Sequence, residues 1–308
     1  MEISWTPPPR VFLREVGPRD GFQNEKTPIP LEAKARLIRR LAEAGFSHIQ
    51  AFSFVNPRRV PQMADAEALA ETLGDLSSVT LSGLALNLSG VRRAASAGVR
   101  LIEIGASASP AHSLANTGMT QERALDALSE MAASARGLGM ETWAGLHCAF
   151  GGPGDEEVPP DRAARLAERI LSLSPACLVL ADTTGSATPP SVAALLRRVL
   201  PLAGSTPVLL HLHDTRGLGL VNLFTALSLG VGRFDTSFGG LGGCPFIAGA
   251  AGNIATEDAL FLLESLGLSA GVSGRGVAAC SRSMEKLLGR VLPGRMHRLH
   301  QTDDSGIF

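Results

Sequence analysis

Two histidines that lie two residues apart offer the sharpest chemistry in the sequence. His211 and His213 stand in the segment VLLHLHDTRG, at the end of an apolar run that predicts a buried strand. Side chains two apart on a strand project to the same face, so both imidazoles can bind one metal ion. A single inward histidine is more often a hydrogen-bonded core residue, but this pair, with a candidate carboxylate at Asp20, favours ligation. Two imidazoles with a carboxylate and an amide oxygen predict magnesium or manganese rather than structural zinc.

Asp20 belongs to a second segment that could carry chemistry, VFLREVGPRDGFQNE at residues 11–25. Its apolar start predicts a strand, and Gly17 and Pro18 end that strand and place Arg19 and Asp20 on a loop. Such a loop is either a solvated turn or part of a site.

A third segment, GGLGGCPFIAGAAGNIATED, begins at Gly239 and carries Cys244. Repeated glycines permit positive φ and close backbone approach, so this segment can fold over a ligand, and a thiol there can relay a proton. A flexible linker is the alternative interpretation. Thr256 with Glu257 and Asp258 is typical of a negatively charged helix start, which would anchor the end of the loop.

The elements that must position these residues alternate regularly along the chain. Short apolar runs and amphipathic stretches succeed each other eight times, which predicts a closed (β/α)8 TIM barrel over residues 11–266. Strands are expected near 11–16, 46–52, 79–86, 100–106, 141–148, 176–182, 206–213 and 232–238. Helices are expected at 31–44, 58–73, 89–97, 120–137, 160–173, 189–201, 218–229 and 256–266. A doubly wound open sheet is the rival, but the first turn, GPRDG, is not the GxGxxG fingerprint, and no GxxxxGK[ST] segment occurs.

In such a barrel the site lies at the carboxyl ends of the strands, and polar residues collect there. Those expected at strand ends are Asp20, Gln50, Ser53, Asn87, Ser107, Ser109, His147, Cys148, Asp182, Thr183, His211, His213, Asp214, Cys244 and Asn253. From this set and the neighbouring Gln23, we expect substrate contacts from Gln23, Gln50, Ser53, Asn87, His147 and Thr183.

The composition of the chain disfavours two classes of binding partner. The formal net charge of -1, with 45% hydrophobic and 19% charged residues, disfavours binding to nucleic acid or to an anionic membrane. Residues 1–10 form a Pro-rich N-terminal extension without a signal-peptide pattern, so the expected location is cytoplasmic. Four scattered cysteines without a CxxC pair favour free thiols. Residues 267–308 are expected to hold a C-terminal helix, within Val277–Val291, and a polar tail that forms an appendage.

Six segments together resemble the 3-hydroxy-3-methylglutaryl-CoA lyase family of the DRE-TIM metallolyase superfamily. They are EVGPRDGFQNE, SFVNPRRVPQMAD, GASAS, ADTTGSATP, HLHDTRG and GLGGCPFIAGAAGNIATED, in an order and spacing that cover residues 11–266. The resemblance implies a (β/α)8 barrel that uses a divalent cation to cleave a 3-hydroxy-3-methylglutaryl thioester into acetyl-CoA and acetoacetate. It also implies an acyl-CoA substrate, a homodimer, and a place in leucine degradation and ketone-body formation.

Residue by residue, the resemblance implies four metal ligands, which are Asp20, His211, His213 and Asn253. Arg19 would steady the thioester enolate, and Cys244 would act in proton transfer. A retro-Claisen cleavage must remove the proton of the tertiary hydroxyl and hold the electrons of the breaking C–C bond, so a metal and a guanidinium suit its two demands. His213 or Asp182 could accept the hydroxyl proton.

The chain departs from the family pattern around the substrate. Gln50 replaces the family's strand-2 glutamate, which removes one negative charge while keeping the shape. In HCAFGGPGDE, His147 replaces a serine, and Gly152 and Gly154 replace a cysteine and a tyrosine of the pattern SCxxGCPYEG; Arg216 stands where an aromatic is common. A lyase or Claisen condensing enzyme acting on a different acyl-CoA, or a catalytically silent acyl-CoA-binding paralogue, are therefore the alternatives.

Overall fold

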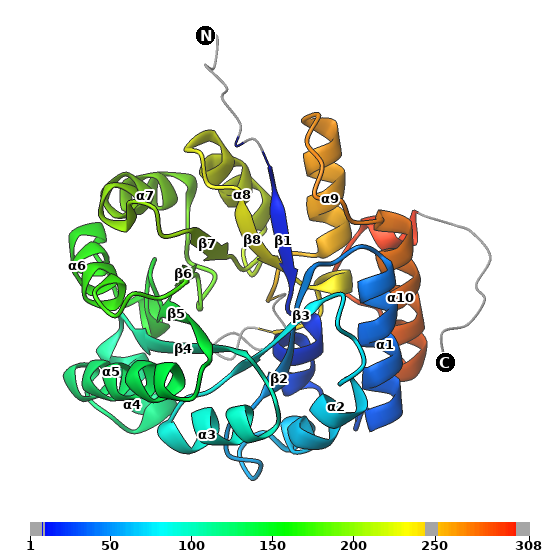
Figure 1. Ribbon diagram of the computed structural model, residues 1–308. Coiled ribbons are helices and arrows are strands. Elements are labelled where there is room, and N and C mark those ends of the chain that lie inside the picture. Colours follow the sequence, from blue (N-terminus) through cyan, green and yellow to red (C-terminus); the bar gives the residue numbers. More distant parts are fainter. Residues whose placement is uncertain (1–7, 9, 244–251, 300–308) are drawn as a thin grey trace, which may run out of the picture.

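The eight strands close into one parallel barrel, in a computed structural model that describes residues 8, 10–243 and 252–299 (Figure 1). The strands follow chain order around the barrel, and each pairs in parallel with the next. They are β1 (Phe12–Glu15), β2 (His48–Ser53), β3 (Thr80–Leu84), β4 (Leu101–Ser107), β5 (Glu141–His147), β6 (Cys177–Ala181), β7 (Val208–His211) and β8 (Arg233–Thr236). The predicted (β/α)8 barrel is confirmed, and the open doubly wound sheet is excluded.

Helices surround the barrel and bury their apolar faces against it (Figure 1). Those of the described residues are α1 (Leu31–Glu43), α2 (Ala66–Thr72), α3 (Leu88–Ser96), α4 (Pro110–Thr117), α5 (Gln121–Gly137), α6 (Pro160–Leu171), α7 (Pro189–Ala203), α8 (Gly219–Ser228), α9 (Thr256–Ser265) and α10 (Gly274–Leu288). No helix of the residues described here is long and apolar enough to cross a membrane.

Two helix predictions differ from the structure. The predicted helix at 58–73 shrinks to α2, preceded by a short 3-10 turn at Pro61–Met63, because the Asn56 side chain accepts from the backbone N–H of Arg58 and forms a local turn. Helix α4 was not predicted at all. Its eight residues are too few for a clear periodic pattern, and it forms because Ser109 caps the N–H of His112 at 3.0 Å and Gly118 ends it in a left-handed conformation.

Strand register sets charged residues in a row inside the barrel. Arg14 of β1 lies opposite Asp235 of β8, and Asp235 lies opposite His211 of β7. Because neighbouring residues of parallel strands face the same side, all three side chains point inward at one level. Arg14 is fully buried, with its guanidinium 4.7 Å from the ring centroid of Trp143. The barrel interior is therefore ionic just below the polar mouth.

The start of the predicted polar tail packs onto the body. Asp258 of α9 accepts hydrogen bonds from the N–H groups of Arg295 and Met296, at 2.9 and 2.7 Å. His297 is completely buried and contacts Glu285 of α10 at 3.0 Å. This part of the tail is held by carboxylates on two helices rather than standing apart as an appendage; residues 300–308 lie outside the described residues.

Candidate active site

A cavity of about 590 Å³ opens at the carboxyl end of the barrel. Eight of the residues predicted from the sequence line it, namely Arg19, Asp20, Gln23, Asn87, His147, Thr183, His211 and His213. Glu103 and His112 also line it, and the sequence analysis did not single them out. Six of the fifteen polar residues expected at the strand ends therefore line this one cavity.

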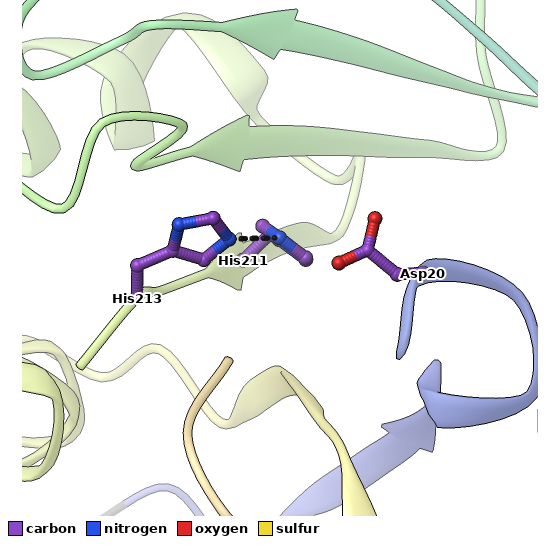
Figure 2. A group of neighbouring side chains, drawn as sticks. All are labelled: Asp20, His211 and His213. Carbon is purple, nitrogen blue, oxygen red and sulfur yellow. Dashed lines mark hydrogen bonds between the residues drawn. The ribbon is translucent and has the colours of Figure 1, made fainter. Parts of the chain in front are cut away.

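Asp20, His211 and His213 converge on one point of this cavity (Figure 2). One potential ligand atom from each lies within 4.8 Å of the others, and the two Nε2 atoms are 3.1 Å apart. His213 follows β7 and forms an isolated bridge with Asn253, whose Nδ2 donates to Asp20 Oδ2 at 2.7 Å. The four predicted ligands therefore come together from three separate segments of the chain.

The histidine tautomers fit a divalent cation. Asp235 Oδ2 lies 3.0 Å from His211 Nδ1, so a proton on Nδ1 leaves the Nε2 lone pair free toward His213. A carboxylate behind a ligating histidine is the usual means of fixing its tautomer and raising its basicity. Burial and the neighbouring His211 lower the pKa of His213 to about 3, so its ring is neutral and can donate a lone pair. The donor set of imidazole, carboxylate and amide suits magnesium or manganese.

Charge keeps the two nearest carboxylates ionised. Burial raises the pKa of Asp20, but Arg19 and the two histidines outweigh it and bring that pKa to about 2. Burial acts in the same way on Asp235, and the paired Arg14 holds its pKa well below the usual range. Arg14 binds Asp235 through Nε and Nη2, each at 2.7 Å. The site therefore offers an anionic ligand and an anionic supporting group.

The GPRDG turn places Arg19 beside Asp20. Gly17–Gly21 forms a single π-helical turn, in which the N–H groups of Arg19 and Asp20 both bond the carbonyl of Val16. Gly17 is required there, since a Cβ would lie 2.5 Å from the ring of Phe238. Arg19 Nη1 donates to Asp20 Oδ1 at 2.6 Å, and this oxygen also accepts from Gln23 at 3.0 Å. The sequence interpretation of this junction as a site rather than a solvated turn is supported.

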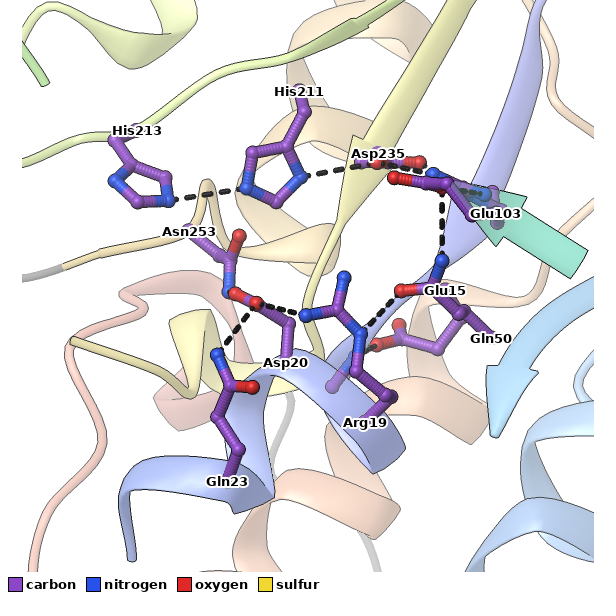
Figure 3. A network of polar contacts seen from close by, with 12 residues as sticks. Glu15, Arg19, Asp20, Gln23, Gln50, Glu103, His211, His213, Asp235 and Asn253 are labelled. Atoms are coloured by element: carbon purple, nitrogen blue, oxygen red, sulfur yellow. Dashed lines mark hydrogen bonds and ion pairs between the residues drawn. The ribbon is translucent and has the colours of Figure 1, made fainter. Parts of the chain in front are cut away.

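Three predicted residues lie behind the cavity wall. Gln50 is fully buried in β2, where Oε1 accepts from Arg19 Nε at 2.5 Å and Nε2 donates to Glu103 Oε2 at 2.9 Å (Figure 3). Ser53 is also fully buried, and its hydroxyl meets no partner among the residues described. Asp182 accepts from the N–H groups of Ser186 and Ala187, at 2.9 and 3.0 Å. None of the three lines the cavity, so the structure does not place Gln50 and Ser53 where they would contact a substrate directly.

Other predicted residues lie on the cavity wall. Thr183 Oγ1 accepts from the N–H of Cys148, and Asn87 caps α3 through the N–H of Gly90, both at 2.8 Å. The Nε2 atom of His147 is buried without a hydrogen-bond partner among the described residues, and burial lowers the His147 pKa to about 4. The ring of His147 covers Gly105, where a Cβ would lie 2.7 Å from Nε2.

The glycine segment is anchored on both sides of a part that lies outside the described residues, and Cys244 belongs to that part. Before it, Glu257 Oε2 accepts from the N–H of Gly239 at 2.9 Å. Gly242 adopts a φ of +136°, and a Cβ there would lie 2.6 Å from Asn253 Nδ2. The three described cysteines are buried free thiols, and burial raises the pKa of Cys148 to about 11, which makes it unreactive.

Sequence reasoning passed over the charged residues inside the strands. Glu103, Asp235 and Arg14 support the site, yet each stands within an apolar run and so was absorbed into a strand. Their signal was the charge itself, because an ionised side chain in a buried strand needs a partner. The partner, however, lies on a distant strand that no local pattern names.

Comparison with known proteins agrees with this geometry. The HMGL-like family model matches residues 10–283. The hydroxymethylglutaryl-CoA lyase YngG of Bacillus subtilis is 35% identical over 288 residues, 94% of this chain and 96% of that protein. An (R)-citramalyl-CoA lyase of Chloroflexus aurantiacus is 38% identical over 295 residues, 92% of each chain.

Solved structures give the same result. The Bacillus subtilis HMG-CoA lyase superimposes with a TM-score of 0.92 at 34% identity, covering 96% of this chain and 99% of that one. An HMG-CoA lyase of Acinetobacter baumannii, in complex with coenzyme A and 3-methylmalate, has a TM-score of 0.90 at 35% identity and covers 96% of both chains. This chain accordingly belongs to the 3-hydroxy-3-methylglutaryl-CoA lyase family of the DRE-TIM superfamily and is a carbon–carbon lyase.

Proposed function

We propose that the protein is a divalent-metal-dependent lyase that cleaves 3-hydroxy-3-methylglutaryl-CoA, or a similar 3-hydroxyacyl-CoA, by retro-Claisen chemistry. For the first substrate the products are acetyl-CoA and acetoacetate. The observation that carries the proposal is the convergence of Asp20, His211 and His213 beside Arg19 in one cavity. Such an arrangement also argues against a silent acyl-CoA-binding paralogue, because binding alone needs neither a ligand set nor a guanidinium beside it.

The metal would be held by Asp20, His211, His213 and Asn253, and magnesium or manganese suits these ligands. When bound, the cation supplies Lewis-acid polarisation of the substrate hydroxyl and carboxylate. The side chains around it do the rest. The ion pair with Asp20 and the bond to Gln50 hold Arg19 rigidly, with its Nη2 free of hydrogen-bond partners among the described residues. That nitrogen can therefore donate to the thioester oxygen as charge develops there.

The reaction balances with groups of this chain. The tertiary hydroxyl loses its proton to His213 or Asp182 while the C–C bond breaks, and its electrons move into the thioester enolate. Cys244, on the glycine segment, is our proposed donor of the proton that converts the enolate to acetyl-CoA. Asp182 has an Oδ2 atom without a partner in the described part of the chain, and burial raises its pKa to about 6. His213 lines the cavity but would give its Nε2 lone pair to the metal, whereas Asp182 lies behind the cavity wall, so Asp182→Asn and the pH dependence of kcat decide between the two acceptors.

A second candidate substrate is citramalyl-CoA, whose cleavage between the same two carbons yields acetyl-CoA and pyruvate. Two observations favour it beside the first. The relative from Chloroflexus aurantiacus bears that activity in its name at 38% identity. Two residues that depart from the family pattern also belong to this site, His147 on the cavity wall and Gln50 behind it, where it bonds Arg19. The buried Nε2 of His147 offers one polar contact to such an acyl group. In either case we propose an acyl-CoA as the ligand, and a homodimer as the assembly.

The test compares both thioesters in one assay that detects acetoacetate and pyruvate separately, with metal-free enzyme and with added magnesium or manganese. We expect turnover of at least one thioester that requires the cation. His213→Ala should lower both Mn²⁺ affinity and turnover, while its melting temperature reports folding. Failure of the metal-loaded wild type to cleave either thioester would refute the substrate proposal. Unchanged Mn²⁺ affinity in His213→Ala would refute the metal site.

A further inference from the structure

A chain of polar contacts runs from Asp20 through Arg19 and the barrel interior to His211, and the two ends of this chain lie within 4.8 Å of each other, which completes a ring of residues (Figure 3). Arg19 bonds Gln50, Gln50 bonds Glu103, and Glu103 Oε2 lies 2.6 Å from Arg14 Nη1. Arg14 binds Asp235 through two bonds of 2.7 Å, and Asp235 reaches His211 at 3.0 Å. On the other side, Arg19 returns to the site through Asp20 at 2.6 Å. Arg19 is thus fixed from two directions.

Gln50 can occupy its place in the ring only in one orientation. The guanidinium of Arg19 only donates, so it selects the oxygen of the Gln50 amide. The carboxylate of Glu103 accepts in this contact, so it selects the nitrogen. Both ends of the amide are used, and Gln50 is 0% exposed while Glu103 is 4% exposed. The two partners therefore determine the orientation of the amide.

A glutamate at position 50 would not fit this ring while Glu103 is present. It would place a second carboxylate at the 2.9 Å contact that the amide nitrogen now makes with Glu103. Two buried carboxylates at that distance cannot both stay ionised. As it stands, two guanidinium groups, of Arg14 and Arg19, face three carboxylates, of Asp20, Glu103 and Asp235. The charge that Gln50 lacks is therefore present one contact farther along, at Glu103.

We propose that Gln50 and Glu103 act together as the positioning pair for Arg19, and that Gln50 is matched to Glu103 rather than a neutral replacement. The pair acts through Arg19, because it holds the guanidinium where the enolate oxygen forms. This inference rests on the proposed lyase function for its kinetic readout. Its structural core, the placement of Arg19, can be measured by ligand binding alone.

The test exchanges the two side chains. Gln50→Glu places carboxylate against carboxylate, Glu103→Gln places amide against amide, and the double variant restores one of each. In the double variant, the position-103 amide can give its oxygen to Arg14 and its nitrogen to the position-50 carboxylate. Glu168→Gln, an exposed position on α6, is the matched control for loss of one negative charge. Gln50→Met removes both bonds without adding charge, in case Gln50→Glu does not fold.

Two readouts separate positioning from other effects. On whichever thioester the wild type cleaves, we expect each single variant to lose at least about tenfold in kcat with KM within about threefold, because the enolate charge exists only past the ground state. We expect the double variant to recover to within about threefold of wild type. Calorimetric affinity for S-carboxymethyl-CoA, whose carboxylate mimics the enolate, should follow the same order. Mn²⁺ affinity should stay within about threefold throughout.

Each result decides the matter. If the double variant is no more active than the worse single variant, the proposed pairing is refuted. It is also refuted if the single variants, or Gln50→Met, keep the wild-type kcat and the wild-type affinity for S-carboxymethyl-CoA. A parallel fall in Mn²⁺ affinity would show that the ring acts on the metal and not on Arg19. If the wild type cleaves neither thioester, the lyase proposal fails by itself, and the S-carboxymethyl-CoA series still tests the pair.

Discussion

Replacing Asp235 by asparagine tests the support behind the proposed metal site, because this carboxylate contacts both Arg14 and His211. It is 2% exposed and accepts two 2.7 Å bonds from Arg14 as well as the 3.0 Å contact with His211 Nδ1. Breaking a buried ion pair by removing one partner costs about 3–5 kcal/mol. Arg14 keeps Glu103 at 2.6 Å, and asparagine can still accept one bond, so we expect a loss smaller than this range, about 2–3 kcal/mol.

Two measurements report this change. The free energy of unfolding should fall by that amount, which lowers the melting temperature by about 3–5 °C in a chain of this size. Mn²⁺ affinity should fall by about 10–100-fold, because asparagine no longer fixes the His211 tautomer that frees Nε2. Calorimetry and Mn²⁺ titration of the same samples give both values.

The matched control removes an aspartate charge from a surface ion pair. Asp161→Asn breaks a pair with Arg198 whose side chains are 68% and 43% exposed, so it should cost less than about 1 kcal/mol. Mn²⁺ affinity should not change in this control. If Asp235→Asn binds Mn²⁺ as tightly as the wild type, the supporting role toward His211 is refuted. If it also melts at the wild-type temperature, the argument for a costly buried charge at Arg14 is refuted as well.

Three further outcomes are expected. Burial raises the pKa of Asp182 to about 6, so kcat should fall below pH 6 if Asp182 accepts the hydroxyl proton. A kcat that does not change down to pH 4, or that Asp182→Asn does not alter, would leave His213 as the acceptor. Gly105→Ala puts a Cβ 2.7 Å from His147 Nε2, so it should destabilise by about 1–3 kcal/mol and raise KM, whereas Gly137→Ala, with no atom within 4 Å, should do neither. Burial raises the pKa of Glu15 from 4.5 to about 8, so its contribution to stability is complete below pH 4.5 and is lost as the pH rises through 8. Glu15→Gln should therefore flatten the dependence of the melting temperature on pH over this range, and an unchanged slope would contradict this account.

Local features of the chain could be predicted from the sequence because their physical cause is local. The spacing of His211 and His213 follows from strand geometry, and the Gly17-Pro18 turn follows from backbone sterics. Apolar runs marked all eight strands, since parallel strands are buried on both faces. Helix α4 was missed because two capping contacts, and not an extended periodic face, make it form.

The supporting residues could not be predicted because their partners are set by closure of the barrel. Arg14 and Asp235 are 221 positions apart, and Gln50 and Glu103 are 53 apart, yet each pair meets at hydrogen-bond distance. The sequence shows which residues are charged or polar, but it does not show which of them pair. In the sequence, Gln50 appears only as the loss of a negative charge relative to the family pattern. In the structure, its amide bridges Arg19 and Glu103.

The sequence by itself determined the class of fold, the family and the candidate metal ligands, since periodicity, turns and short motifs are encoded by neighbouring residues. Only the tertiary structure decided which groups orient those ligands and hold Arg19. Strand order and register place β1, β8 and β7 side by side, and so bring Arg14, Asp235 and His211 to one level. A buried charge is stable only beside its counter-charge, and that neighbour exists only once the barrel has closed.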